Sequence, residues 1–180
     1  SQKTVDDFSA CDDLKILVHS NPKLLTFGTK KPKFIEVALG GSKEEKLAYV
    51  KNNLGKEITI NDVFEKGNII DIHGITKGKG FQGTVKRFGV PIRQHKAEKT
   101  KRGIATLGPW HPKRIAYTVP QSGKMGYHLR TEYNKQIVKI GSEEKEINPA
   151  GGIKNYGLIK NTYVLIRGSL PGSRKRALLL

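Results

Sequence analysis

Short runs in which polar residues alternate with β-branched or aromatic ones recur along most of the chain. Runs of this kind that end at glycine, proline or asparagine are typical of β-strands. The pattern predicts eight short strands, over residues 14–19, 34–39, 69–75, 81–88, 115–119, 136–140, 157–160 and 162–167.

One segment has helical rather than alternating spacing. Ser42 and Glu45 are three residues apart, so the hydroxyl and the carboxylate can bond to the free amides of a first helical turn. Three apolar residues then follow at helical spacing, and a glycine that can end the helix comes directly after them. The sequence therefore predicts one short amphipathic helix over residues 43–54.

A long segment between residues 89 and 114 has neither helical nor strand spacing and contains proline, glycine, histidine and positive charge. A loop of about 25 residues without secondary structure is uncommon in a compact domain and is usually functional or disordered. Several short strands with glycine-rich turns favour a β-barrel. The predicted fold class is therefore mainly β: a barrel with one short helix and a long basic loop extension.

Positive charge is concentrated in the middle of the chain. The 180 residues carry 33 Lys and Arg against 16 Asp and Glu, a formal net charge of +17. Residues 76–135 hold 14 of the basic residues and two acidic ones, a net charge of +12, while the other 120 residues carry +5. We predict a discontinuous barrel domain (1–75 and 136–180) and a basic extension (76–135) with a finger loop at 89–114, whose partner is a polyanion.

Composition excludes several other classes of protein. No apolar run approaches the roughly 20 residues that a transmembrane helix needs. Cys11 is the only cysteine, so neither an internal disulfide nor a paired-cysteine zinc site is possible, which fits a reducing compartment. No basic start followed by an apolar core marks a signal peptide. We expect a cytoplasmic protein without a membrane partner.

The glycines at 78, 80 and 83 match the glycine-rich loop of nucleotide-binding proteins. That loop requires a following helix and, in dinucleotide folds, an acidic residue about 20 residues further on. Residues 84–88 resemble a strand instead, and no acid lies at that distance. A nucleotide-dependent enzyme therefore stays only as a competing hypothesis. The favoured interpretation is a turn that lets a sugar–phosphate backbone approach closely, with Lys77 and Lys79 neutralising it.

No catalytic constellation is recognisable, so we predict that the chain is not an enzyme. His73 lies within a predicted strand and is interpreted as a hydrogen-bonded structural histidine. His111 and His128 have no third ligand at a recognisable spacing. We expect no metal, no cofactor and no small-molecule substrate.

Trp110 is the only tryptophan and lies between Pro109 and Pro112 in the basic segment. Two interpretations stay open: the ring packs into a core, or it is presented at a loop tip. The second is favoured because the neighbouring cations would be costly to bury. An exposed aromatic ring in a basic loop can stack on an unpaired base. RNA is favoured over DNA because the basic region contains no predicted recognition helix.

Five linked motifs add a resemblance to these observations. They span residues 74–83, 99–103, 108–112, 126–135 and 147–152, in this order. With them the chain, from about residue 14 to its last residue, closely resembles the large-subunit ribosomal protein three family of the archaeal and eukaryotic type. Full-length members extend further in both directions, so we expect the chain to be a fragment that lacks the basic N-terminal arm.

The resemblance implies a six-stranded barrel of the translation-protein type. It also implies a structural constituent of the large ribosomal subunit that binds large-subunit ribosomal RNA, contacts neighbouring ribosomal proteins and supports subunit assembly. Its basic loop, with Trp110 near the tip, is expected to reach towards the peptidyl transferase centre. The alternative function is that of a non-ribosomal RNA-binding chaperone.

The predicted RNA-binding residues are the cations and histidines of the basic extension together with its tryptophan. Most of them are expected to contact phosphates, which positions a protein on RNA without reading its sequence. They are Lys77, Lys79, Lys86, Arg87, Arg93, His95, Lys96, Lys99, Lys101, Arg102, Trp110, His111, Lys113, Arg114, Lys124, His128, Arg130 and Lys135.

Overall fold

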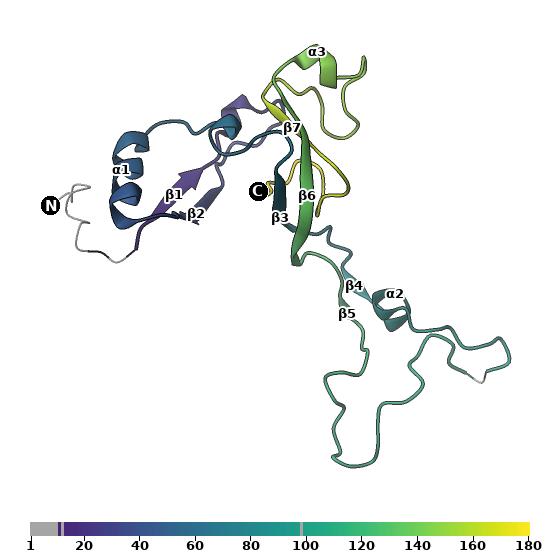
Figure 1. The fold of residues 1–180 in the computed structure, drawn as a ribbon. Helices are drawn as coiled ribbons and strands as arrows, with labels where there is room; N and C mark the ends of the chain where they lie inside the picture. The colour runs from purple at the N-terminus through teal and green to yellow at the C-terminus, as the bar shows by residue number, and fades with distance from the viewer. Residues whose placement is uncertain (1–10, 12, 98) are drawn as a thin grey trace. The chain divides into compact units, whose positions relative to one another are not determined.

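The computed structural model describes residues 11, 13–97 and 99–180. It is mainly β, with a few short helices (Figure 1). In the described part of the chain, no helix is both long enough and apolar enough to cross a membrane. The strands are β1 (Lys15–His19), β2 (Phe34–Ala38), β3 (Ile69–Ile75), β4 (Phe81–Gln82), β5 (Gly123–Lys124), β6 (Leu129–Gly141) and β7 (Tyr163–Ile166), and the α-helices are α1 (Lys43–Asn53), α2 (Thr84–Phe88) and α3 (Glu144–Ile147).

The strands form three small sheets. β1 pairs with β2 and β4 with β5, both antiparallel, and a third sheet has the order β3–β6–β7. Among the residues that the structure describes, none of these sheets closes on itself. The prediction of a mainly β fold is therefore confirmed, whereas the six-stranded barrel stays a prediction.

The chain divides into two compact units. The first contains the residues up to Ile70 together with Asn134–Gly168, and the second contains Asp71–Tyr133 with Ser169–Leu180. Both β3 and β6 contribute residues to each unit. The division that the charge distribution predicts, at residues 76 and 135, stays a prediction.

The core of the first unit lies where β6 pairs with β7. Ile137 is completely buried and Tyr163 nearly so. The Tyr163 hydroxyl donates to the Glu146 carboxylate at 2.9 Å, and the Lys139 ammonium bonds to the same carboxylate. The Lys139 hydrogen bond, followed by that of Tyr163, lowers the pKa of Glu146, so the carboxylate is charged over the neutral pH range. This polar group therefore ties α3 to both strands of the core.

The predicted helix is confirmed as α1. The Glu45 amide donates to the Ser42 hydroxyl at 3.4 Å, and the Ser42 amide donates to the Glu45 carboxylate at 2.8 Å. These bonds satisfy two amides that the first helical turn would leave unpaired, and they lower the pKa of Glu45. Leu54 caps the helix, and Gly55 follows it with φ +76°.

The predicted strand over residues 81–88 is wrong beyond its first two residues, and the prediction of a single helix is wrong with it. Residues 84–88 form α2, and α3 is a third α-helix. Thr84 and Val85 favour strand on local preference alone. The deciding feature is Gly89, whose left-handed conformation (φ +69°) caps the C-terminus of α2.

Two other predicted strands, 115–119 and 157–160, are absent. The Val119 amide bonds to the Ala116 carbonyl in a turn. In the second segment, the Asn148 side chain accepts from the Ile159 amide at 2.8 Å and donates to its carbonyl at 2.7 Å. A side-chain amide thus supplies the pairing that a neighbouring strand would otherwise give. The predicted strand 136–140 is present but is the end of the much longer β6.

Candidate nucleic-acid interface

Two segments of the second unit run antiparallel beside each other and form the base of the candidate site. The Thr76 amide donates to the His128 carbonyl at 3.0 Å, and the Lys79 amide donates to the Met125 carbonyl at 2.9 Å. Phe81 is paired with Lys124 where β4 meets β5. These backbone bonds fix Cα positions from which several basic side chains emerge.

Gly126 allows the two paired segments, residues 76–82 and 123–128, to form a narrow ribbon. Its φ is +73°, and a Cβ built on it would overlap the Lys77 carbonyl oxygen. Only glycine adopts such a conformation at so close a backbone approach without strain. The glycine therefore holds the backbone at Lys77 directly against the returning segment.

A groove of ≈ 680 Å³ lies along the ribbon, and the residues that line it come from four different segments. It is lined by five Lys or Arg side chains and one histidine, and no carboxylate of the described residues lines it. A concave surface lined by positive charges concentrates the electrostatic field and attracts anions. The lining residues are Thr76, Lys77, Lys79, Arg87, Phe88, Lys124, Met125, Gly126, His128, Arg130, Leu170, Pro171 and Gly172.

Arg87 is held in place inside this groove. Its guanidinium donates to the Gln121 carbonyl at 2.8 Å and lies 5.1 Å from the centre of the Phe88 ring. Gly123 makes room for it, because a Cβ there would lie 2.5 Å from the Arg87 Nη1 atom. One edge of the guanidinium is thus anchored, which leaves the other donors of its planar fork for an anion.

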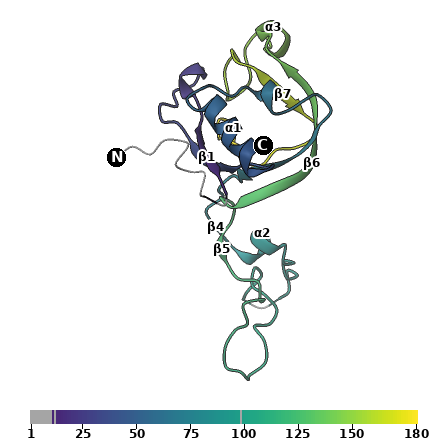
Figure 2. The same ribbon diagram turned by 60° about the vertical axis from the view of Figure 1, so that its left-hand side comes forward.

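The structure brings six of the predicted RNA-binding residues together in the groove and places the others elsewhere. Most of the others lie on the long segment between α2 and β5, which has no helix or strand over residues 89–97 and 99–122 (Figures 1 and 2). Lys135 belongs to the first unit. The predicted residues that do not line the groove are Lys86, Arg93, His95, Lys96, Lys99, Lys101, Arg102, Trp110, His111, Lys113, Arg114 and Lys135.

One of these cations is used within the loop. The Arg93 amide donates to the Lys101 carbonyl and its guanidinium donates to the Ile104 carbonyl, both at 3.0 Å. The Thr84 hydroxyl of α2 donates to the Arg102 carbonyl at 3.4 Å. Arg93 therefore organises the first half of the loop in addition to any role towards RNA.

Trp110 is 81% exposed. Gly108, two residues earlier, has φ +121°, and the Lys113 amide donates to the Trp110 carbonyl in a turn. The interpretation in which this ring packs into a core is therefore wrong, and the ring is presented to solvent. Tyr117 in the same loop is also exposed over its whole surface. The sequence interpretation did not include this second aromatic residue, although the basic loop around it was the available signal.

Replacing Trp110 by alanine is expected to leave the free energy of unfolding within about 0.5 kcal/mol of the original value, because the ring has no core contacts to lose. Ile72→Ala is the matched control, since Ile72 is completely buried in the same unit and its truncation costs about 2–5 kcal/mol. Chemical denaturation of both variants measures this difference. A loss of about 3–5 kcal/mol in Trp110→Ala, as for a buried tryptophan, would contradict the exposed position.

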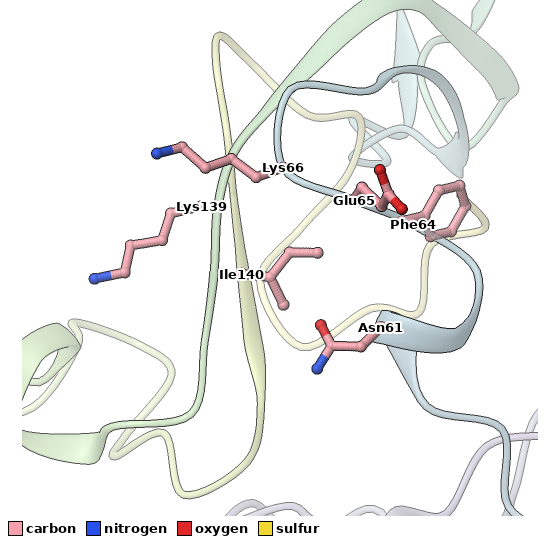
Figure 3. A pocket seen from close by; sticks show the side chains of 6 residues that line it. All are labelled: Asn61, Phe64, Glu65, Lys66, Lys139 and Ile140. Carbon is pink, nitrogen blue, oxygen red and sulfur yellow. The ribbon is translucent and has the colours of Figure 1, made fainter.

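The first unit has a cavity of its own, of ≈ 590 Å³, with different chemistry. Figure 3 shows the side chains of Lys66 and Lys139 pointing to one side of it, with Phe64 and Glu65 on the other. The Lys139 ammonium is paired with the Glu146 carboxylate. The polar groups do not converge on a common point, so this cavity is not the candidate site.

The sequence argument that no helix follows the glycine motif is wrong, because α2 does follow it, but the other features of this segment do not favour a nucleotide loop. Residues 81–82, inside the glycine motif, are strand β4, and the helix after them, α2, has only five residues. A helix of this length, about 7.5 Å, is also too short to serve as a recognition helix in a DNA groove. No group of three or more potential metal ligands occurs in the described residues. His73 bonds to the Thr131 hydroxyl at 2.8 Å, which confirms its structural interpretation.

Comparison with known proteins identifies the family of the chain. The family described as "Ribosomal protein L3" matches residues 2–180. Three curated relatives are named "Large ribosomal subunit protein uL3". The protein of Methanocaldococcus jannaschii is 48% identical over 99% of this chain and 56% of its own length. That of Methanococcus vannielii is 50% identical over 99% and 55%, and that of Methanothermobacter thermautotrophicus is 50% identical over 93% and 51%.

The chain thus spans about half the length of the curated relatives that it matches. All three come from archaea, in agreement with the predicted archaeal type, and their names agree with the prediction of a ribosomal protein that is not an enzyme. Because the family match extends over almost the whole sequence, the resemblance that the five motifs indicate is confirmed. The chain belongs to the ribosomal protein L3 family.

Proposed function

We propose that this chain is a structural constituent of the large ribosomal subunit and that it binds large-subunit ribosomal RNA through the second unit. The observation that carries the proposal is the groove, which five Lys or Arg side chains and a histidine line, without a carboxylate from the part of the chain that the structure describes. RNA carries one negative charge per nucleotide. A surface of this kind can therefore neutralise several phosphates along the RNA backbone. The name of the relatives, "Large ribosomal subunit protein uL3", supports this partner.

The long loop has a second role in the proposal. Its cations are exposed, and its two aromatic rings, Trp110 and Tyr117, are available for stacking on unpaired bases. We infer that the predicted RNA-binding residues outside the groove contact RNA mainly from this loop, and that the loop extends towards the peptidyl transferase centre. Neighbouring ribosomal proteins are proposed as further partners, subunit assembly as a further role, and the cytoplasmic ribosome as the location.

The six-stranded barrel of the translation-protein type is part of the same proposal. The sheets formed by β1–β2 and β3–β6–β7 contain five strands outside the basic loop, and these strands are the candidates for the barrel wall. The relatives have nearly twice the length of this chain, which leaves room for additional strands. An experimental structure of a full-length relative tests whether the strands close.

Binding to purified large-subunit ribosomal RNA, compared with an unrelated transcript of equal length, tests the proposed function. We expect a preference for the ribosomal RNA of about tenfold or more, equivalent to about 1.4 kcal/mol. A tagged chain is also expected to sediment with large-subunit particles in a sucrose gradient. Equal affinity for both RNAs, with no sedimentation in these particles, would instead favour the RNA chaperone.

A further inference from the structure

The C-terminal residues 169–180 belong to the second unit, although they lie far from its other residues in the sequence. The His73 amide donates to the Leu179 carbonyl at 2.9 Å, and the Leu179 amide returns a bond to the His73 carbonyl at 3.0 Å. Gly74 has no room for a side chain, because a Cβ there would meet Leu178 and Pro171 at 2.5 and 2.8 Å. The C-terminal segment is thus packed closely along β3.

This packing makes the segment one wall of the groove. Leu170, Pro171 and Gly172 line the groove together with the basic side chains described above. Gly172 has φ +105°, and a Cβ on it would come within 2.6 Å of the Ile75 carbonyl oxygen. The wall therefore turns directly against the end of β3, where the groove begins.

Arg176 is fixed beside this wall. Its guanidinium donates to the carbonyl oxygens of Ile75 and Thr76, both at 3.3 Å, and lies 5.3 Å from the centre of the Tyr127 ring. Thr76 itself lines the groove. Arg176 has the same type of environment as Arg87, whose guanidinium bonds to a backbone carbonyl and lies over an aromatic ring.

A guanidinium held in this way retains donors for a ligand. Two of its five N–H donors can be used by the carbonyls, and the planar group still presents a fork suited to a phosphate. The Arg176 side chain is exposed, as are its sequence neighbours Arg174 and Lys175. The sequence analysis did not include Arg174, Lys175 and Arg176, because they lie 39 residues or more beyond the basic extension.

We propose that residues 169–180 complete the groove as a binding site for consecutive phosphates of an RNA backbone, with Arg176 as an additional phosphate ligand. This inference rests on the proposed function. The lining cations come from separate segments and occupy a groove of ≈ 680 Å³, which exceeds the size of one phosphate group. Several cations along one concave surface match the repeated charges of a backbone better than a single anion.

Arg176→Gln tests the added ligand, and Arg167→Gln is its matched control because Arg167 is an exposed arginine of the first unit. One lost phosphate contact is expected to weaken binding to large-subunit ribosomal RNA about 5–8-fold at about 0.1 M salt. The slope of log affinity against log salt should also decrease by about 0.7–0.9. Arg167→Gln should change neither quantity. Equal affinities and slopes for the two variants would overturn the role of Arg176.

Lysine acetylation of the unmodified protein provides a test that does not depend on a variant folding correctly. Ribosomal RNA is expected to protect Lys77, Lys79 and Lys124 from acetylation and to leave Lys43 and Lys160, exposed residues of the first unit, reactive. Inorganic phosphate at the same phosphate concentration should protect none of them. Equal protection by inorganic phosphate would overturn the requirement for consecutive phosphates.

The two proposals fail in different ways. If the ribosomal RNA binds but leaves the three groove lysines reactive, the groove assignment is wrong and the proposed function stands on the loop alone. If the chain binds the ribosomal RNA no better than an unrelated transcript, the proposed function is wrong, and the groove assignment fails with it.

Discussion

Raising the salt concentration from about 50 to about 200 mM is expected to weaken binding of this chain to large-subunit ribosomal RNA by about 10³–10⁵-fold. The estimate assumes about 6–10 neutralised phosphates, each of which releases condensed counterions when a cation replaces them. The groove supplies five Lys or Arg side chains, and the exposed cations of the loop supply the remainder. Fluorescence anisotropy titrations at several salt concentrations measure the slope directly.

A control for the fold separates this loss of affinity from unfolding of the chain. The same titrations are repeated while circular dichroism monitors the fold, since the fold of the free chain is expected to be intact at both salt concentrations. A slope near zero, with the fold intact, would mean that phosphate contacts do not dominate binding. The loop aromatics Trp110 and Tyr117 would then be the main source of affinity.

Replacing Gly126 by alanine is expected to be the most damaging single change in the second unit. A left-handed conformation costs a non-glycine residue about 1–2 kcal/mol, and overlap of the new methyl group with the Lys77 carbonyl adds about 1–3 kcal/mol of overpacking. The free energy of unfolding should therefore decrease by about 2–5 kcal/mol. RNA affinity should decrease as well, because Lys77 and Lys79 are displaced from the groove.

Gly80→Ala is the control for this change. Gly80 has a similar left-handed conformation (φ +67°), but a Cβ on it meets no atom within 4 Å. It should therefore show only the conformational cost of about 1–2 kcal/mol. Chemical denaturation of both variants measures the difference. If the two glycines prove equally tolerant, the close approach of Gly126 to Lys77 is not a feature of the protein in solution.

Local patterns predicted the elements whose stabilising contacts are themselves local. The Ser42–Glu45 capping pair identified α1 because both bonds lie within one turn. The prediction of a strand over residues 81–88 was wrong because, over so short a segment, alternation of apolar and polar residues does not distinguish a strand from a single helical turn. At residues 157–160 the deciding group is the side chain of Asn148, 11 residues from Ile159, which no local pattern reveals.

The same distinction applies to the candidate site. Charge identified the basic segment, and the glycines at 78–83 drew attention to Lys77 and Lys79, which do line the groove. Charge could not determine which cations converge, because that depends on the pairing of residues 76–82 with 123–128. Arg176 was missed because its partner, the Ile75 carbonyl, is 101 residues away.

The separation of Ile75 and Arg176 in the sequence also determines when the groove can be completed during protein synthesis. A ribosome adds about 5–20 residues per second, so the interval between making Ile75 and making Arg176 is about 5–20 s. The last of the groove cations, Arg130, is made 46 residues before Arg176, so the cations of the ribbon exist for about 2–9 s without the wall that residues 169–180 provide. A nascent chain therefore carries an unfinished, strongly positive groove for several seconds. The wall itself can form only after residue 179 has been made, when Leu179 pairs with His73.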